Sequence, residues 1–396
     1  MSGSLNWPLS SDSDLFIKLL GAKVPGFDSY IFKMCSCDFH NKISSCVILY
    51  YIPILTSGKM KVFITGEKGF IGRNLVKKLP EFGFSHITSD DVIKLKEFHT
   101  DGKEYTYHKS GELCVHQNTI AQWIEFFFRT KTEGIIHNAA SVGTDVVALN
   151  PNDSTLTNVA GTYNICRAAK MLGIPVCYMG TTVIYDVAKY QKSEITESSL
   201  KRPTTLYGCH KLCAEDIVKT QTGKRWMIVR PLFAYGGEGD MNSLIAKTSF
   251  GYINGKTGID MFLDQDKVKD YMHVDDYCDA VLTAISRGMW NDDWNVSAET
   301  PLSTGEIMLM LERILVEECG GTGIEDVLTW HPKTDYLGNH RLSSSKFRRY
   351  AGWKPKISLE AGIRRTVREI KESEDYDPLV HLEEAKEKGV DLTSFY

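Results

Sequence analysis

The chain has 396 residues, of which 42% are hydrophobic and 24% are charged. This ordinary globular composition excludes collagen, coiled-coil and wholly disordered classes, and the length predicts about two domains. With 46 basic and 50 acidic residues, the formal net charge is −4, which offers no broad positive field to a nucleic acid or an anionic membrane.

The ten cysteines are scattered along the chain, which predicts reduced thiols and no disulfide framework. Cys35 and Cys37 are spaced closely, but no second pair with the spacing of a zinc site follows them, so we expect no metal site. The longest apolar run, at residues 46–55, is too short to span a bilayer, and the N-terminus lacks the pattern of a secretory signal. These features predict a cytoplasmic protein.

Residues 1–59 are rich in serine and cysteine and show no sustained helix or strand period. At Met60 a short run of β-branched and aromatic residues begins, and it ends at Gly66, which is the pattern of a buried parallel strand. We predict that residues 1–59 are an extension outside the catalytic unit, arising for example from an upstream start codon. An organelle transit peptide is the alternative, and the acidic residues of this stretch argue against it.

After Met60, strand and helix patterns alternate. We expect strands at 61–65, 86–89, 134–137, 176–180 and 226–229, and helices at 73–79, 120–128, 155–172 and 211–220. This alternation predicts an α/β fold with a doubly wound parallel sheet and helices on both faces. Beyond Pro231, glycine and aspartate interrupt the pattern, and helices expected at 304–319 and 359–372 indicate a smaller C-terminal lobe.

The first predicted strand runs into a glycine-rich turn, Gly66-Glu-Lys-Gly69-Phe-Ile-Gly72. Glycine lets such a turn close tightly, so that N–H groups at the following helix N-terminus face an anion such as a pyrophosphate. Asp90 ends the second predicted strand, where a carboxylate accepts hydrogen bonds from a ribose diol and repels a 2′-phosphate. The pattern predicts a dinucleotide site and favours NAD over NADP. Asp91 could make the ribose contact instead, and a plain glycine turn with a solvated acid is the structural alternative.

Tyr207 and Lys211 are spaced i and i+4, so on a helix they share one face. An ammonium beside the phenol lowers its pKa from about 10 and allows proton exchange near neutral pH. Thr181 and Thr182 follow the strand expected at 176–180, at the carboxyl end where ligands bind to parallel sheets. We interpret Thr181 as holding the reacting oxygen of a substrate. The alternatives are a strand-end cap for Thr181 and a helix-surface role for Tyr207.

With these motifs the chain resembles the extended short-chain dehydrogenase/reductases of the nucleotide-sugar epimerase and dehydratase kind. The motifs occur along the chain in the same order as in that family. The resemblance covers nearly all of residues 60–370. Further matching segments are His137-Asn-Ala-Ala140, Asn158-Val-Ala-Gly-Thr, Thr181 with Tyr185, Arg230-Pro-x-x-x-Tyr-Gly236, Asp270-Tyr-Met-His273-Val-Asp-Asp276 and Gly352-Trp-Lys-Pro-Lys-Ile-Ser. The resemblance implies a Rossmann-type NAD-binding domain at 60–230, to which 270–295 return, and a substrate-binding lobe and tail at 231–269 and 296–396.

The resemblance also implies residue roles. Tyr207 would be the acid/base, Lys211 would bind the nicotinamide ribose, Thr181 would orient the substrate and Asn158 would support the polar network at the cofactor. Other cofactor contacts would come from Gly66, Gly69, Phe70, Ile71, Gly72, Asp90, Ala139 and Ala140. The candidate substrate contacts are Thr182, Phe233 and Arg341. Arg341 is either a contact to the nucleotide diphosphate or a solvated loop arginine. Members of the family often dimerise through two helices of each subunit, so the resemblance also implies a homodimer.

Departures from the family pattern narrow the prediction. The 4,6-dehydratases carry an Asp-Glu pair after the catalytic threonine, where this chain has Thr182 and Val183, so we do not expect a 4,6-dehydratase. Phe233 replaces an asparagine that contacts the sugar or phosphate in many relatives. His116 and Gln117 stand where relatives usually place an acid that reads adenine.

We therefore predict an NAD-dependent epimerase or keto-reductase of a nucleotide-activated sugar. The rivals are a reductase of a steroid-like or other alcohol and a non-catalytic dinucleotide sensor; a pure sensor would not need Thr181, Tyr207 and Lys211 together. Two residues near Lys211 are assigned structural roles. Cys209 is expected to be buried, facing away from Tyr207, and His210 is expected to lie on the helix surface.

Overall fold

The computed structural model describes residues 59–91, 104–237, 239–240, 243–261, 263–332 and 338–373. Apart from Lys59, the predicted N-terminal extension lies outside the described residues, as does the tail beyond residue 373. Among the described helices, none has the length and apolar character needed to cross a membrane.

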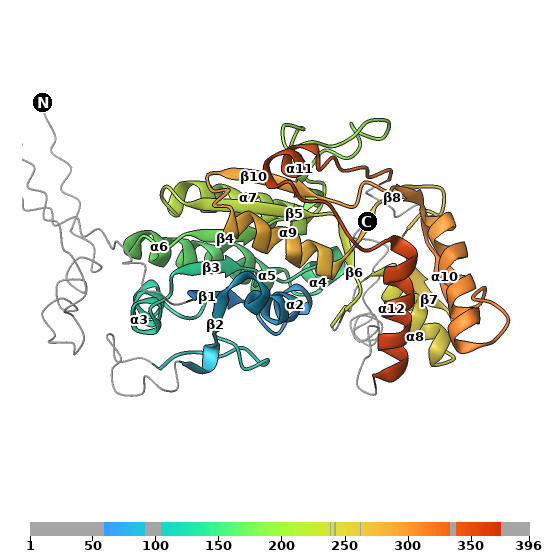
Figure 1. Ribbon diagram of the computed structural model, residues 1–396, viewed down its shortest axis with the longest axis horizontal. Coiled ribbons are helices and arrows are strands. Elements are labelled where there is room, and N and C mark those ends of the chain that lie inside the picture. The colour runs from blue at the N-terminus through green and yellow to red at the C-terminus, as the bar shows by residue number, and fades with distance from the viewer. Residues whose placement is uncertain are drawn as a thin grey trace, which may run out of the picture.

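A six-stranded parallel sheet forms the centre of the larger part of the molecule (Figure 1). Its strands are β1 (Met60–Thr65), β2 (Phe84–Ile87), β3 (Gly134–His137), β4 (Val176–Met179), β5 (Trp226–Pro231) and β10 (Asp292–Val296). Their order is β10-β5-β4-β3-β1-β2, and every neighbouring pair is parallel. The winding direction reverses between β1 and β3, so the carboxyl ends of these strands border the crevice where ligands bind in such sheets. The predicted doubly wound, Rossmann-type sheet is confirmed.

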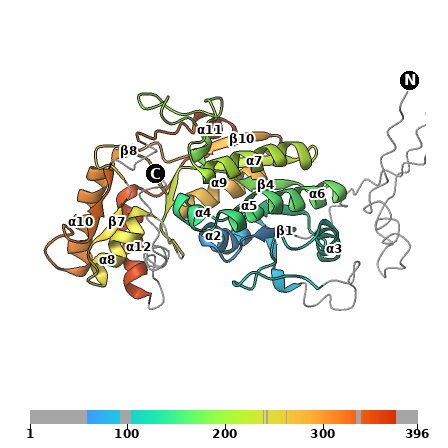
Figure 2. The ribbon, with the colours of Figure 1, turned by 180° about the vertical axis from the view of Figure 1, so that it is seen from behind.

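Helices cover both faces of this sheet, which Figures 1 and 2 view from opposite sides. The helices and single turns of this part are α2 (Phe70–Lys78), η2 (Leu79–Phe82), α3 (Ile120–Thr130), α4 (Thr144–Leu149), α5 (Pro151–Thr155), η4 (Leu156–Gly161), α6 (Thr162–Leu172), η5 (Thr182–Ile184), α7 (Leu206–Gln221), α9 (Val274–Ser286) and α11 (Ser345–Ala351). One core joins the sheet to α2, α9 and α11, and further cores join it to α3, α6 and α7. All residues of β3 and β4 are buried because helices cover both faces.

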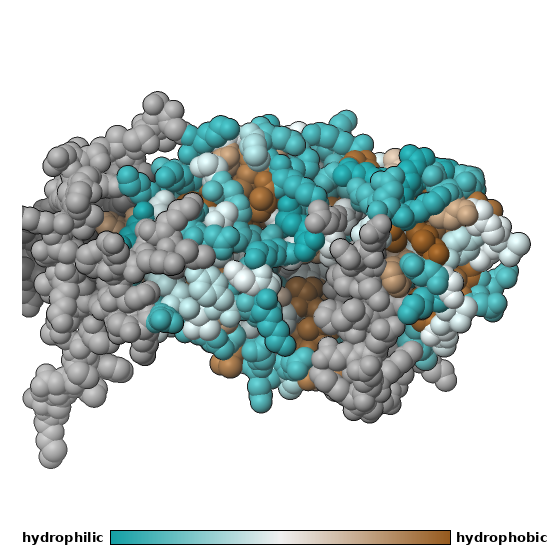
Figure 3. Space-filling model, turned by 90° about the horizontal axis from the view of Figure 1, so that it is seen from below, coloured by the Kyte–Doolittle hydropathy of each residue, from teal (hydrophilic) through white to brown (hydrophobic). Residues whose placement is uncertain are grey.

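A smaller lobe packs beside the carboxyl end of the sheet, on the right of Figure 1. Its elements are β6 (Phe233–Tyr235), α8 (Leu244–Ile253), β7 (Ile259–Met261), β8 (Val268–Lys269), β9 (Tyr271–His273), β11 (Leu302–Ser303), α10 (Thr304–Cys319), β12 (Leu328–Trp330) and α12 (Leu359–Glu372). The three helices share one apolar core, and the short strands pair as β6 with β9, β7 with β12 and β8 with β11. From below, the coloured surface is mostly hydrophilic, with hydrophobic residues in separate patches (Figure 3).

The predicted bounds of the elements are confirmed closely in several places. The strand at 134–137 and the helices at 304–319 and 359–372 agree with β3, α10 and α12. The helix expected at 155–172 is divided instead, because a π-helical turn, η4, separates α5 from α6. Helix α7 begins at Leu206, where Thr205 caps it by accepting a hydrogen bond from Gly208 N at 3.1 Å. The cap therefore puts Tyr207 in the first helical turn.

Three buried histidines predict that this fold is labile to acid. Burial lowers the pKa of His137 and of His340 to about 3, and that of His273 to about 4. Between pH 6.5 and about 4 the unfolded chain therefore binds more protons at these residues than the folded chain, and stability falls as pH falls. Asp270 acts in the opposite sense, because burial raises its pKa to about 6. For these four residues alone, the net difference of about two protons corresponds to a loss of about 3 kcal/mol per pH unit.

We expect urea titrations followed by tryptophan fluorescence to show this loss between about pH 6 and about pH 5. His340→Leu is the matched variant, because neither ring nitrogen of His340 has a hydrogen-bond partner. The variant should reduce the pH dependence by the contribution of one proton, about 1.4 kcal/mol per pH unit. Equal pH dependence in the two proteins would contradict the assignment to buried histidine.

Candidate functional site

The glycine-rich turn after β1 closes so tightly that side chains would not fit in it. Gly66 has a φ of 70°, and a Cβ there would lie 2.9 Å from the backbone N of Ala139. A Cβ on Gly72 would collide with Gly66 O. The glycines thus let the turn fit between the end of β3 and the start of α2.

The first turn of α2 presents backbone N–H groups to this crevice. Gly69 N donates to Gly66 O at 3.2 Å, and the first bond of the helix runs from Arg73 N to Gly69 O at 2.9 Å. The N–H groups of Phe70, Ile71 and Gly72 precede that bond. A helix N-terminus of this kind fits a pyrophosphate.

A hydrogen-bonded network fixes the ends of β1 and β3. Thr65 Oγ1 accepts hydrogen bonds from the N–H groups of Asn138 and Ala139 at 3.1 and 3.0 Å, and it lies 2.7 Å from His137 Nδ1. Because the oxygen already accepts two hydrogen bonds, the hydroxyl donates its own proton in the hydrogen bond to Nδ1. His137 Nε2 then donates to Thr162 Oγ1 at 2.9 Å. The histidine is therefore neutral, in agreement with its low pKa.

Asn158 fixes the next part of the crevice wall. Its Oδ1 accepts a hydrogen bond from Ser141 N at 2.7 Å, and its Nδ2 donates to Ser141 O at 3.0 Å. Asn158 belongs to the π-helical turn η4, an irregularity that often marks functional sites. This clamp positions the segment with Ala139 and Ala140, which follows β3.

Two acids follow β2, and they differ in exposure. Asp91 accepts hydrogen bonds from Thr88 N and Oγ1 at 2.9 and 3.3 Å, which closes its own turn. The Asp90 side chain is exposed. Of the two predicted candidates, Asp90 is thus the acid whose carboxylate can face a ligand.

Sequence reasoning passed over two other acids at this end of the sheet. Glu67 has its carboxylate buried against β2, and Glu112 Oε1 accepts a hydrogen bond from Lys68 N at 3.1 Å. His116 instead lies at η4, with Nδ1 3.3 Å from Thr157 Oγ1. The glycine-rich turn is therefore contacted by an acid, Glu112. His116 and Gln117, which stand where relatives usually place an acid, are not acidic themselves. The one sequence signal that could have pointed to Glu67 is the presence of an acid between the first two glycines of the pattern.

Tyr207 and Lys211 are both buried on α7, at 8% and 3% exposure. Lys211 Nζ donates to Met179 O at 2.6 Å and lies 4.3 Å from the centre of the Tyr178 ring. Burial lowers the pKa of Lys211 to about 7, and the Glu215 carboxylate partly offsets this shift. The lysine thereby links α7 to the carboxyl end of β4.

Thr181 follows directly on that end of β4. Its Oγ1 caps η5 by accepting a hydrogen bond from Val183 N at 3.5 Å. A Cβ on Gly208 would lie 2.9 Å from Val183 O, so the start of α7 packs closely on η5. The structure thus brings Thr181, Tyr207 and Lys211 to adjoining elements at one edge of the sheet, and the capping alternative for Thr181 holds as well.

A buried ion cluster behind these residues was not predicted. Arg230 is fully buried and donates from Nε and Nη2 to the two carboxylate oxygens of Glu215 at 2.7 and 2.8 Å. It also donates to Tyr185 Oη at 2.8 Å and pairs with Asp293. Glu215 extends the i, i+4 spacing of Tyr207 and Lys211 by one more turn, which is the signal that could have found it. The cluster ties α7 to β5 and β10.

The candidate substrate residues lie in and near the smaller lobe. Phe233 stacks on Tyr271 with ring centres 5.2 Å apart and meets His340 edge-on at 5.9 Å. Lys269 is buried, donates from Nζ to Gly338 O at 2.6 Å and lies 5.7 Å from the Phe233 ring centre. Phe233 is therefore brought to the segment that contains Arg341. Lys269 directly precedes the Asp270 motif, but nothing in the sequence distinguishes it from a lysine on the surface.

Thr182 is buried and Arg341 is half-buried. The backbone oxygen of Arg341 accepts a hydrogen bond from Ile195 N at 2.8 Å. Within the described part of the chain, no group of three or more His, Cys, Asp or Glu side chains could hold a metal ion.

Two predictions on α7 are wrong. Cys209 is exposed, and His210 is buried with Nε2 3.0 Å from Thr155 Oγ1. His210 is three residues after Tyr207 and so lies near the buried face, where α4 and α5 cover it. Cys209, two residues after Tyr207, lies on the opposite face.

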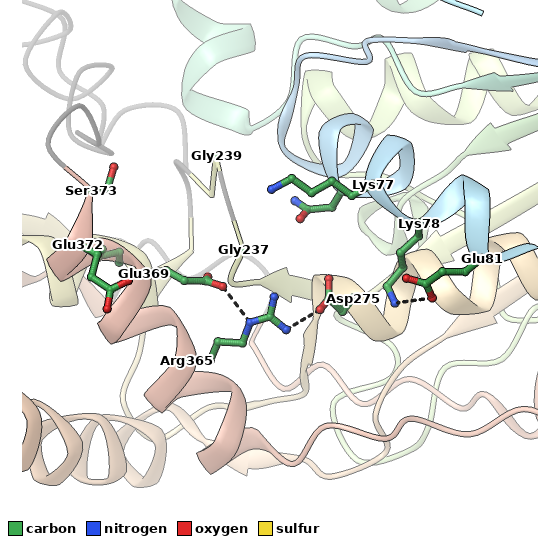
Figure 4. Close-up of a pocket in the computed structure, with 12 residues that line it drawn as sticks. Lys77, Lys78, Glu81, Gly237, Gly239, Asp275, Arg365, Glu369, Glu372 and Ser373 are labelled. Carbon is green, nitrogen blue, oxygen red and sulfur yellow. Dashed lines mark hydrogen bonds and ion pairs between the residues drawn. The ribbon is translucent and has the colours of Figure 1, made fainter. Parts of the chain in front are cut away.

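A separate pocket of about 440 Å³ lies between α2, the start of α9 and α12 (Figure 4). Arg365 points between Asp275 and Glu369, to which it donates at 2.6 and 2.8 Å, and Lys78 pairs with Glu81 at 3.8 Å. Arg365 and Lys78 are thus both paired with acids, and no predicted site residue lines the pocket. It is therefore not the candidate site.

Comparisons with known proteins agree with this geometry. Residues 62–328 match the model of the NAD dependent epimerase/dehydratase family. The dTDP-glucose 4,6-dehydratase of Neisseria gonorrhoeae is 22% identical over 342 residues, which cover 79% of this chain and 96% of that protein. The UDP-glucose 4-epimerase of Mycolicibacterium smegmatis is 25% identical over 320 residues, covering 78% and 97%. The structure of RMD from Pseudomonas aeruginosa complexed with NADPH has a TM-score of 0.64 at 19% identity, covering 79% and 99%, which shows a shared fold.

Proposed function

The chain belongs to the NAD dependent epimerase/dehydratase family, and from this premise we propose that it is an NAD-dependent epimerase or keto-reductase of a nucleotide-activated sugar. The observation that carries the proposal is the hydrogen bond from Lys211 Nζ to Met179 O at 2.6 Å. It holds the helix face with Tyr207 against the strand end that continues into Thr181. A phenol, an ammonium and a hydroxyl thus lie on adjoining elements at the carboxyl end of the sheet, where the glycine-rich turn also lies.

A bound nicotinamide supplies the hydride chemistry in such an enzyme. Tyr207, as a phenolate, takes the proton from a sugar hydroxyl, and the Lys211 ammonium stabilises the phenolate. Thr181 Oγ1 donates a hydrogen bond to the same oxygen and holds the carbonyl that forms. When Tyr207 returns the proton, a hydroxyl restored with inverted configuration completes an epimerisation. The same residues would protonate the product of a reduction when the sugar arrives as a ketone and the hydride comes from a reduced nicotinamide.

We do not propose the dehydration named for one of the relatives. Loss of water needs an acid and a base beside the sugar, and the positions after Thr181 hold Thr182 and Val183. Valine has no proton to transfer. Thr182 is buried at the start of η5.

We propose NAD as the cofactor, held at its pyrophosphate by the N–H groups of Phe70, Ile71 and Gly72. Asp90 then accepts hydrogen bonds from the adenosine ribose. Lys211 and Tyr207 bind the nicotinamide ribose, and Asn158 holds the wall formed by Ala139 and Ala140.

We propose that the nucleotide diphosphate of the substrate is bound by cations of the smaller lobe. Lys269 is buried beside Phe233, and Arg341 lies on the segment that follows Gly338. Phe233 offers an apolar ring where an amide would contact the sugar or phosphate. We also keep as proposals the domain bounds given above, with 270–295 returning to the cofactor domain.

We propose a homodimer formed through the exposed side of η4, α6 and α7. Leu156, Tyr163 and Leu206 are 48%, 41% and 47% exposed. Exposed apolar side chains on adjoining helices are typical of an interface. Light scattering of the full chain should give the mass of two chains.

The proposed reaction is tested by incubating the protein with NAD or with NADH and a panel of UDP-, GDP-, CDP- and dTDP-sugars and their 4-keto forms. We expect proton NMR to show conversion of one nucleotide sugar or its 4-keto form, since only a matched substrate aligns with Tyr207 and Thr181. Turnover of a steroid or simple alcohol alone would favour the first rival. NAD binding without hydride exchange across the panel would favour a dinucleotide sensor.

A further inference from the structure

Glu67, the residue after the first glycine of the turn, points away from the helix N-terminus that it precedes. Its carboxylate is buried at 8% exposure. Oε1 accepts a hydrogen bond from Ser89 N at 3.3 Å, and Oε2 lies 2.8 Å from His86 Nε2. The side chain therefore spans from the glycine-rich turn to the end of β2.

Ser89 directly precedes Asp90, so the buried carboxylate lies next to the residue proposed to contact the ribose. In dinucleotide-binding sheets the ribose 2′ position lies at this strand end, and a 2′-phosphate there needs a nearby cation. A second fixed carboxylate at the same strand end makes the local potential more negative.

The two cations of the turn are directed elsewhere. Lys68 Nζ donates to Ser110 O at 2.6 Å, and Arg73 donates to Lys68 O from Nε and Nη2 at 3.1 and 2.5 Å. The carboxylate of Glu112 accepts the Lys68 N–H, which adds another negative charge on this side. Neither cation is placed to neutralise a phosphate at the end of β2.

We propose that Glu67, held in place by the hydrogen bond from Ser89 N, is a second determinant of cofactor choice that excludes a 2′-phosphate. This inference rests on the proposed function, because it places a dinucleotide at the glycine-rich turn. It goes further by assigning discrimination between NAD and NADP to a residue outside the ribose-contacting position. Asp90 and Glu67 then act additively against a 2′-phosphate.

The test compares binding of NADH and NADPH to the full chain by calorimetry, with no substrate present. Glu67→Gln keeps an acceptor for Ser89 N and removes the charge, so we expect the preference for NADH over NADPH to fall by about tenfold, through tighter NADPH binding. Glu81→Gln is the matched control, since Glu81 is an exposed acid of η2, and its preference should equal that of wild type.

A thermal unfolding scan establishes that each variant is folded. If Glu67→Gln is unstable, the double variant Glu67→Gln, His86→Leu also replaces the imidazole whose Nε2 lies 2.8 Å from Oε2, and it should show the same loss of preference. An unchanged preference in a folded variant, or an equal loss of affinity for both dinucleotides, would overturn the assignment of Glu67. Failure of wild type to bind either dinucleotide would instead refute the proposed cofactor site.

Discussion

Replacing Tyr207 with phenylalanine is expected to lower turnover of the true substrate by about 10²- to 10⁴-fold, the usual contribution of one general acid/base. The change removes a single oxygen from a side chain that is 8% exposed. The ring still fills its place on α7, so the fold should remain that of wild type, and dinucleotide affinity, which loses one of several proposed contacts, should fall far less than turnover. The expected signature is thus a loss in kcat without a matching loss in NADH binding.

Turnover is measured by NMR on the substrate that the panel identifies, and NADH affinity is measured by calorimetry. Tyr350→Phe is the matched control, because it removes the same oxygen from a tyrosine that is 58% exposed on α11. We expect the control to keep wild-type turnover. If Tyr207→Phe also keeps it, the acid/base role fails.

The pH dependence of kcat/KM should report Lys211 as well. Burial brings the pKa of its ammonium to about 7, so in the free enzyme the positive charge beside Tyr207 is lost as pH rises through that value. Loss of this charge makes the phenolate harder to form. The Glu215 carboxylate raises the pKa of Lys211 and so favours the charged ammonium. Through this effect the buried ion cluster influences the charge beside Tyr207.

The parts of the site that were predictable from the sequence depend on local spacing. Gly66 and Gly72 are required by a tight turn after a strand, and Tyr207 and Lys211 share a face because a helix repeats every 3.6 residues. Such patterns lie within about 20 residues of chain. They placed the glycine-rich turn, Tyr207 and Lys211 on the elements where the structure has them.

The parts that were missed depend on contacts between distant segments. Arg230 meets Glu215 and Asp293 only because β5 lies between β4 and β10, and Lys269 meets Gly338 across the smaller lobe. The burial of His210 depends in the same way on α5, from which Thr155 reaches it. A single sequence contains no periodicity that reports such pairings, since each is set by the order of strands and the packing of helices.

Arg230→Met is expected to lower the free energy of unfolding by about 3–5 kcal/mol, the usual result of removing one member of a buried ion pair. Glu215 is completely buried, and both of its oxygens accept hydrogen bonds from Arg230. Removing the guanidinium leaves this carboxylate without its counter-charge in the core. Asp293 retains Lys201 at 3.1 Å, so most of the cost comes from Glu215.

The double variant Arg230→Met, Glu215→Leu separates that cost from the loss of packing. With both charges replaced by apolar side chains, we expect much of the lost stability to return. Arg225→Met is the control, because Arg225 makes an exposed bond to Gly173 O and its loss should cost less than about 1 kcal/mol.

Urea unfolding of the four proteins decides between the alternatives. If Arg230→Met is no less stable than the control, the cluster does not hold α7 to the sheet. If the double variant is as unstable as Arg230→Met, the unpaired Glu215 carboxylate is not the cause, and the ion pair itself stabilises the crevice that holds Tyr207 and Lys211.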